Sequence, residues 1–296
     1  MFLEAQINTI IQKHLTSISW LTPGVRLMLI ATFGFTIMQV FVKELAGFHV
    51  SQIVFFRSSI TALFCLTLLR QKGVSILGKS RKLLILRSIC GIIAMTLFFI
   101  TVQRMPLGAS LSLKYLSPIF TAVFAVLLIH EKVKPIQWLF FLTALVGVFL
   151  LKGFDTRIDV ISLIMGIVGA IFGGLVYVVI RKIGNTEHPL VIVNYFMLSA
   201  TILSGIAMTF FWQNPTPLEW GLLFGMGFFG YLGQLYMTRA FQAEAASRVA
   251  PVKYIEVVYS LVIGFLWFGE SYSTLAFAGI LLILLSMILN LNFRSK

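Results

Sequence analysis

The stretch APVKYIEVVYSLVIGFLWFGE, residues 250–270, is apolar enough to lie in a lipid bilayer, yet it contains Lys253 and Glu256. A charge inside a membrane segment costs free energy, so it marks a functional position by default. An earlier stretch, SLKYLSPIFTAVFAVLLIHE at 112–131, has the same character. When the chain is shifted by 139 residues, three pairs coincide: Lys114 with Lys253, Tyr115 with Tyr254, and Glu131 with Glu270.

The composition excludes an ordinary globular protein. Hydrophobic residues make up 59% of the 296 residues and charged residues only 11%, against about 25% charged in a soluble domain. The net charge is +13, but the basic residues stand mainly between the apolar runs, which is typical of topology signals rather than of nucleic-acid binding. Cys65 and Cys90 lie inside apolar runs and predict neither a metal site nor a disulfide.

Apolar runs of about the length that crosses a bilayer as a helix recur along the chain. They predict an all-α integral membrane protein of ten transmembrane helices. The predicted spans are 25–45, 49–69, 83–103, 107–129, 135–152, 160–180, 189–211, 217–239, 248–268 and 273–292. Residues 1–24 lack the features of a secretory signal and are predicted to be a cytoplasmic segment with one apolar helical face.

The Lys and Arg residues between spans predict the orientation. One side is predicted to hold sixteen of them: Lys13, Arg26, Arg70, Lys72, Lys79, Arg81, Lys82, Arg87, Lys132, Lys134, Arg181, Lys182, Arg239, Arg248, Arg294 and Lys296. The other side holds four: Lys43, Arg104, Lys152 and Arg157. Both termini are therefore predicted to be cytoplasmic, in the inner (plasma) membrane. Arg57, Lys114 and Lys253 remain inside the spans.

The shift of 139 residues keeps the two halves in step without gaps. Lys43 meets Lys182, His49 meets His188, Gly91 meets Gly230, and Gln103 meets Gln242. The repeats are predicted at 25–152 and 160–292, with five spans each. An odd number of spans turns the second copy upside down in the membrane, and such inverted repeats are a signature of secondary transporters with alternating access. The alternative is a duplicated structural membrane protein.

Two stretches carry a resemblance to a known family: SPIFTAVFAVLLIHEKV at 117–133 and VVYSLVIGFLWFGESY at 257–272. They resemble the drug/metabolite transporter superfamily, with two tandem EamA domains over about 25–292. The runs FFRSSIT at 55–61, LRSICG at 86–91 and APVKYIEVV at 250–258 resemble the subgroup that includes bacterial S-adenosylmethionine uptake transporters. The resemblance implies a cavity lined by helices one to four and six to nine, with helices five and ten peripheral.

Glu256 is the first candidate for a substrate-binding residue, because the predicted span places it near the membrane midplane. It could hold a cationic substrate group or carry a proton. The alternative is a structural ion pair with Lys253, three residues earlier on the same helix face. Lys253 and Lys114 are candidates for binding a substrate carboxylate, and for Lys114 the alternative is an extended side chain that reaches the outer headgroups.

Arg57 is a candidate because its repeat partner is Phe196, so its charge breaks the symmetry. The alternative is a structural pair with Glu44 or Glu270. The remaining substrate-binding candidates are the aromatic and amide side chains Tyr254, Tyr115, Tyr259, Gln39 and Asn194. Each of these has a structural alternative, namely packing for the aromatics and interhelical hydrogen bonds for the amides.

Glu131 and Glu270 close their spans at opposite mouths of the predicted cavity, so they are candidates for gating. Pro118, predicted in the middle of span four, and Pro251, early in span nine, would free backbone carbonyls and permit bends. Arg81, Lys82 and Arg87 are interpreted as ordinary cytoplasmic charges, although Arg87, at the mouth of span three, could attract anions.

The sequence thus predicts a secondary transporter that moves a small polar metabolite, of zwitterionic or charged amino-acid-like chemistry. S-adenosylmethionine is one candidate, from the resemblance alone. The predicted partners are the metabolite, the lipid bilayer and a coupling proton or counter-substrate, with no cofactor, metal or nucleic acid. An intramembrane enzyme would need a nucleophile with a base or a metal constellation, and the four His residues are scattered. A channel or scaffold is the third alternative.

Overall fold

The computed structural model describes residues 21–45, 47–104, 113–152, 160–268 and 274–292. In these ranges the fold is all-α, without a β-strand, and helix is present in each of the ten predicted spans. The first half contains α2 (Pro23–Glu44), α3 (Val50–Gln71), α4 (Arg81–Arg104), α6 (Ser117–Ile129) and α7 (Pro135–Lys152). The second contains α8 (Val160–Ile183), η1 (Gly184–Thr186), α9 (Pro189–Met208), α10 (Pro217–Ala243), α11 (Ala246–Val249), η2 (Ala250–Tyr254), α12 (Ile255–Phe268) and α13 (Thr274–Asn292).

The outer surface of these helices is apolar. Leu63, Leu266 and Trp267 are among many large hydrophobic side chains that are more than half exposed. Five helices of the described chain, α2, α3, α4, α8 and α9, are long and apolar enough to cross a membrane, and α6 and the first part of α7 are shorter apolar helices. Apolar side chains facing outward all round a bundle are what a lipid solvent requires.

Several helices begin where the sequence supplies a cap. His49 and His188, which are repeat partners, both precede a helix and accept a hydrogen bond from the backbone N–H two residues later, at 3.3 Å from Ser51 and 3.2 Å from Leu190. Thr216 and Glu219 form a capping box at the start of α10. These contacts satisfy amide groups that a helix leaves unpaired at its first turn.

Spans four and nine differ from the continuous helices that the hydropathy predicts. Helix α6 begins only at Ser117, and the predicted residues 107–112 lie outside the described chain. Pro118 is therefore in the first turn of α6 and not in the middle of a helix. Pro251 lies in η2, a 3₁₀ segment between α11 and α12. A proline at a helix start costs little because its missing amide has no partner there, so both prolines stand where a helical segment begins.

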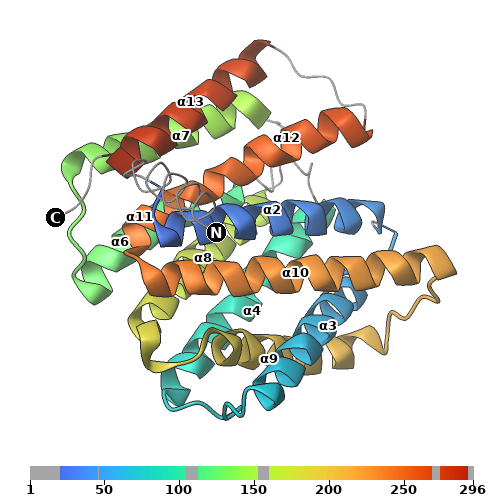
Figure 1. Cartoon of the computed structure of the whole chain (residues 1–296). Helices are drawn as coiled ribbons and strands as arrows, with labels where there is room; N and C mark the ends of the chain where they lie inside the picture. Colours follow the sequence, from blue (N-terminus) through green and yellow to red (C-terminus); the bar gives the residue numbers. More distant parts are fainter. Residues whose placement is uncertain (1–20, 46, 105–112, 153–159, 269–273, 293–296) are drawn as a thin grey trace, which may run out of the picture.

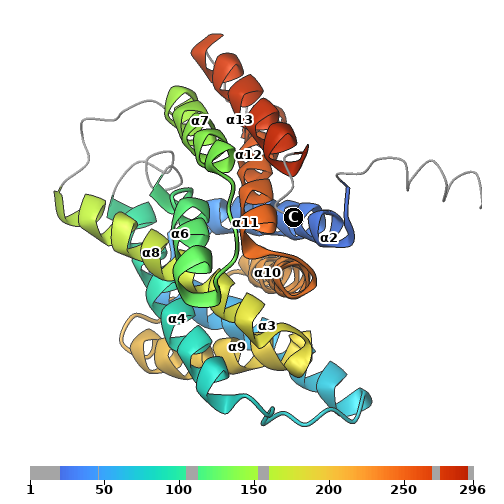
Figure 2. The same cartoon turned by 90° about the vertical axis from the view of Figure 1, so that its left-hand side faces the viewer.

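The packing of helices follows the repeat (Figure 1, Figure 2). Helix α2 packs on α10 as its counterpart α8 packs on α4, and α6 packs on α8 as α12 packs on α2. The counterparts α3 and α9 pack on each other, and so do α7 and α13, which lie side by side at the edge of the bundle in both views. Each of these contacts thus has an equivalent in the other half.

Polar contacts close one end of the bundle. Glu187 accepts hydrogen bonds from the backbone N–H groups of Lys79, at 2.5 Å, and Ser80, just before α4. Gln242, near the end of α10, donates to the carbonyls of Gly184 and of Glu187, the second at 2.9 Å. At the far ends of α9 and α10, Gln52 exchanges two hydrogen bonds with the backbone of Gln213.

Candidate functional site

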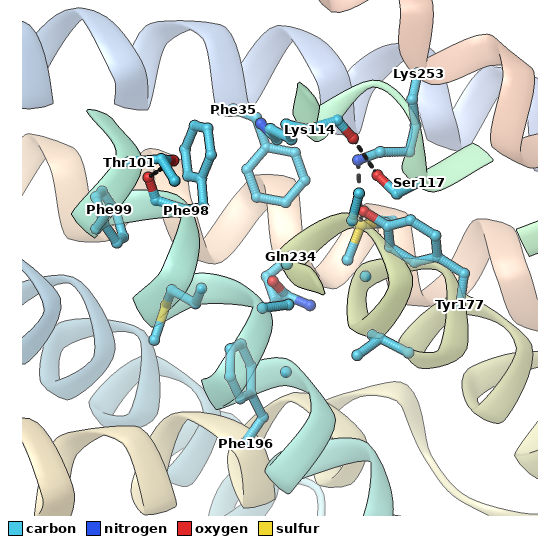
Figure 3. Close-up of a pocket in the computed structure, with 18 of the residues that line it drawn as sticks. Phe35, Phe98, Phe99, Thr101, Lys114, Ser117, Tyr177, Phe196, Gln234 and Lys253 are labelled. Atoms are coloured by element: carbon cyan, nitrogen blue, oxygen red, sulfur yellow. Dashed lines mark hydrogen bonds between the residues drawn. The ribbon is translucent and has the colours of Figure 1, made fainter. Parts of the chain in front are cut away.

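A cavity of about 140 Å³ lies inside the bundle, which is room for several water molecules. Its wall contains residues of α2, α3, α4, α8, α9, α10 and η2, together with Ser117 at the start of α6 and Lys114 just before that helix. These elements correspond to spans one to four and six to nine, as the resemblance implied, and no described side chain of α7 or α13 belongs to the wall. Figure 3 shows Lys253, Tyr177, Gln234 and Phe196 converging on this space from different helices.

Arg57 lies in the cavity wall and is 7% exposed. Its guanidinium contacts two thioethers: Nε lies 3.1 Å from Sδ of Met38 and Nη1 lies 2.6 Å from Sδ of Met95. A thioether is a weak acceptor without charge. Within the described chain no carboxylate pairs with Arg57, so the predicted pairing with Glu44 is absent, and Glu270 lies outside the described residues.

Arg87 is the main site residue that the sequence analysis misjudged. It is 1% exposed and lines the cavity, so it is not an ordinary cytoplasmic charge. Its guanidinium carbon lies 4.0 Å from the centre of the Phe196 ring, a cation–π contact. Its Nε and Nη1 atoms are buried and have no hydrogen-bond partner. Charge counting along the sequence could not separate this arginine from Arg81 and Lys82, which are exposed.

Lys253 also lines the cavity and is 3% exposed. Its Nζ lies over the rings of Tyr177 and Phe35, at 4.9 and 5.5 Å from their centres, and 3.9 Å from Sδ of Met237. It forms no ion pair with Glu256. Lys253 is therefore held by aromatic faces, and Tyr177 and Phe35 were not among the predicted site residues.

Glu256 is fully buried, and its partners are not the one that the sequence suggested. Oε1 accepts a hydrogen bond from Nζ of Lys114 at 2.9 Å and another from the amide of Gln39. Oε2 is buried without a partner. Lys114, whose side chain is 23% exposed, lies in the cavity wall while Glu256 lies behind it. The carboxylate of Glu256 therefore compensates the charge of Lys114. Glu256 itself does not line the cavity, and Lys114 is its link to the cavity wall.

The two paired tyrosines contact each other. The Oη atom of Tyr254 donates to the backbone carbonyl of Tyr115 at 2.8 Å, and the ring centres are 5.9 Å apart. Both rings are buried, and neither lines the cavity. These two positions are 139 residues apart, so equivalent residues of the two halves meet here. The structure thus gives these tyrosines a place at the seam between halves.

The other predicted substrate-binding residues do not line the cavity either. Tyr259 packs edge-on against Phe33, with ring centres 5.7 Å apart. Gln39 is joined to Glu256, as described above. Asn194 is fully buried, and both polar atoms of its side chain lack a partner.

Of the two predicted gating glutamates, Glu131 is described and Glu270 lies outside the described residues. Glu131 accepts hydrogen bonds from the backbone N–H groups of Ala246 and Ser247, at 3.2 and 3.3 Å, and pairs with Nε of Arg181 at 3.2 Å. It thereby connects the end of α6 to the end of α8 and to the start of α11. This is the end of the bundle where Glu187 and Gln242 also form their contacts.

Equivalent positions of the two repeats face the same cavity. Five pairs separated by 139 residues have both members in its wall: Met38 with Tyr177, Arg57 with Phe196, Met95 with Gln234, Phe98 with Met237, and Lys114 with Lys253. Only the lysine pair keeps its residue type. The repeat therefore determines where the wall residues stand, while divergence between the halves determines the chemistry of each side.

The structure is a helical bundle with an apolar exterior and a central cavity lined by buried cations. These features are typical of membrane transporters, and comparison with known proteins indicates the same class. Residues 22–152 and 160–292 each match the EamA-like transporter family. The chain belongs to this family, within the drug/metabolite transporter superfamily, and is a multi-pass membrane transporter.

Relatives extend over nearly the whole chain. It is 32% identical over 274 residues to the pseudopaline exporter of Pseudomonas aeruginosa, covering 90% of this chain and 95% of the exporter. It is 28% identical to solute carrier family 35 member G1 of Homo sapiens (84% and 73% covered) and 22% identical to the S-adenosylmethionine uptake transporter of Rickettsia felis (89% and 88%). A crystal structure with 15% identity superposes with a TM-score of 0.80, covering 91% of this chain and 97% of that one, which shows a shared fold.

Proposed function

We propose that the protein is a secondary transporter that moves a small, charged, amino-acid-like metabolite across the inner membrane by alternating access. The two repeats, 25–152 and 160–292, are inverted copies that rock about the central cavity. The observation that carries this proposal is the contact of Tyr254 with Tyr115, together with the five equivalent pairs in the cavity wall. Inverted repeats with a shared central site are the architecture of alternating access.

In this proposal the network around Glu131 is the gate at the cytoplasmic end. It joins α6, α8 and α11 through hydrogen bonds and one ion pair whose members are partly solvent-accessible. Such contacts can be exchanged for water at modest cost, whereas the apolar packing elsewhere in the bundle cannot. Opening at this end would separate Glu131 from Arg181 and Ser247.

The Lys114–Glu256 pair is proposed to couple the cavity to substrate or proton. Lys114 has one face in the cavity wall and one partner behind it. An arriving anionic group, or protonation of Glu256, would compete for the same ammonium. Either event would release Lys114 from Glu256, and the pair would respond to occupancy of the cavity.

The names of two relatives give opposite directions of transport, one export and one uptake, so they do not assign a direction to this chain. S-adenosylmethionine is the one named candidate, and it comes from the resemblance alone. Counterflow in proteoliposomes tests the proposal: vesicles loaded with a metabolite mixture should accumulate a radiolabelled member of the mixture saturably, and unloaded vesicles should not. A channel would equilibrate the label without counterflow, and an enzyme would consume it.

A further inference from the structure

The cavity wall has a strong excess of positive charge. Four cationic side chains line it: Arg57, Arg87, Lys114 and Lys253. Among the described residues no Asp or Glu lines it, and the nearby Glu256 pairs with Lys114. Three cations are therefore left without a carboxylate in the described chain.

The guanidinium groups of Arg57, from α3, and Arg87, from α4, lie against neighbouring turns of α4. Nη1 of Arg57 is 2.6 Å from Sδ of Met95, and Nη1 of Arg87 lies beside Gly91, four residues earlier in the same helix. Four residues correspond to about 6 Å of helix. A Cβ atom at Gly91 would lie 2.7 Å from Nη1 of Arg87, so the glycine provides the space that this guanidinium occupies.

Neither guanidinium has partners that satisfy it. Among the described residues, Arg87 leaves Nε and Nη1 without acceptors, and the hydrogen-bond contacts of Arg57 are with two uncharged sulfur atoms. Buried charges are normally paired, because desolvation is expensive. A guanidinium offers a planar fork of donors that matches carboxylate and phosphate oxygens. Unsatisfied donors at a cavity wall are what an anionic ligand would complete.

Resting on the proposed function, we propose that the substrate is a small organic anion with at least two negatively charged groups. One group binds between Arg57 and Arg87, and another binds at Lys253. Carboxylate and phosphate oxygens share the required chemistry. A solute with net positive charge meets three uncompensated cations and is excluded. S-adenosylmethionine carries a sulfonium and an ammonium against one carboxylate, so this inference removes it as a substrate.

Ligand binding to the full-length protein in lipid nanodiscs tests the inference. The probes are citrate for carboxylates, fructose 1,6-bisphosphate for phosphates, S-adenosylmethionine as a net cation, and alanine as a neutral zwitterion, all at matched ionic strength. At least one of the two anions should raise the unfolding temperature, and the other two probes should not. The anion that raises the unfolding temperature shows whether the site prefers carboxylate or phosphate oxygens.

Variants locate the binding. Arg57→Gln and Arg87→Gln should each weaken anion binding by about tenfold or more, and Arg87→Lys should weaken it too because an ammonium lacks the fork. Arg70→Gln on α3 and Arg81→Gln on α4 are matched controls, since these arginines are exposed on the same helices. Without ligand, the Gln variants should unfold at the same temperature as the wild type or higher, because they remove unpaired buried charge. If either arginine had a purely structural role, its replacement by Gln would lower the unfolding temperature.

Three results would overturn the inference: stabilisation by S-adenosylmethionine, no stabilisation by either anion, or anion binding that survives both Gln variants. Counterflow on the same preparations separates the two proposals. Anion binding without exchange would contradict the transporter mechanism and leave the anion site standing. Exchange of a cationic solute would leave the transporter standing and refute the anion site.

Discussion

The Nζ atom of Lys114 lies 2.9 Å from the Oε1 atom of Glu256 and joins side chains 142 positions apart. Lys114 belongs to the first repeat and Glu256 to the second. The residue equivalent to Glu256 in the first repeat is Ser117, so the first repeat offers no matching acid to Lys253 of the second repeat. The ion pair thus has no counterpart in the other repeat, although it lies next to the Tyr115–Tyr254 contact, which joins two equivalent positions.

This pair gives the first prediction. Lys114→Met leaves the buried carboxylate of Glu256 without its cation, and we expect the free energy of unfolding to fall by about 3 kcal/mol. Glu256→Gln should also destabilise, and the double variant should lose much less than the sum of the two. The measurement is reversible unfolding in detergent. Lys253→Met combined with Glu256→Gln is the control and should be additive. Additivity for the Lys114–Glu256 pair would mean that the contact contributes nothing.

The same variants separate a structural role for Glu256 from a functional one. If the pair serves only the fold, the stable double variant should transport as the wild type does. We expect instead that transport stays lost in the double variant, because no carboxylate remains to respond to substrate or proton. Uptake normalised to folded protein decides between these outcomes.

Gly91→Ala is the second prediction. The added methyl group would meet Nη1 of Arg87 at 2.7 Å and the Phe196 ring at 3.0 Å. Because the end of an arginine side chain can move, the fold should survive with a loss of about 1–3 kcal/mol, but the guanidinium should leave its position and transport should fall. At the equivalent Gly230, an added Cβ would lie 3.2 Å from Sδ of Met38, a tight contact that a flexible side chain can relieve, and 3.5 Å from the nearest Arg57 atoms, an ordinary contact. Gly230→Ala should therefore impair transport less, and equal transport by both variants would argue against a positioned Arg87.

The sequence predicted the positions of the helices well, but it predicted the ion-pair partners of the charged side chains poorly. Hydropathy and the repeat predicted helix in ten places, and helix is present in each within the described chain. Proximity along the chain suggested Lys253 as the partner of Glu256, whereas the fold supplies Lys114 from another helix. Partners across a bundle depend on the rotation of each helix about its axis, which short-range spacing does not determine.

Arg87 shows the same limit. It stands close to Arg81 and Lys82 in the sequence, so charge counting assigned all three to the cytoplasm. Arg87 lies five residues beyond Lys82, about one and a half helical turns, and there its side chain points into the bundle and is 1% exposed. Its removal from the count of sixteen leaves fifteen against four, and the predicted orientation is unchanged.

The third prediction concerns pH. Burial, and then the nearby charges of Lys72 and Arg239, lower the pKa of His188 below its ordinary value of 6.5. Nδ1 must be unprotonated to accept the N–H of Leu190, so the folded state favours the neutral ring and the unfolded state binds more protons. The stability from this cap is thus present above about pH 6.5 and is lost as pH falls through the lowered folded value.

His188→Asn provides the comparison, because asparagine caps a helix without titrating in this range. Unfolding temperatures measured from about pH 5 to about pH 7.5 should rise with pH more steeply in the wild type than in the variant. Parallel curves would show that His188 does not contribute to the pH dependence of stability.

The fourth prediction concerns topology. The charge count places the loop at 70–82 in the cytoplasm and the loop at 153–159 outside. A cysteine at Ile76 should therefore resist a membrane-impermeant thiol reagent in intact cells, and a cysteine at Thr156 should react. The native Cys65 and Cys90 are buried and should give little background. Labelling at position 76 in sealed cells would reverse the assignment.

The central claim is that the cavity is reached from each side of the membrane in turn. The most direct test places a cysteine at Ala94, in the cavity wall, in a variant with Cys65→Ala and Cys90→Ala. A second variant adds Glu131→Cys and Ser247→Cys, whose native side chains are in hydrogen-bond contact at 3.3 Å, so that a disulfide can lock the cytoplasmic gate. We predict labelling of position 94 from both sides before the lock, and from the outside alone after it. Labelling from a single side throughout, or from both sides despite the lock, would contradict alternating access.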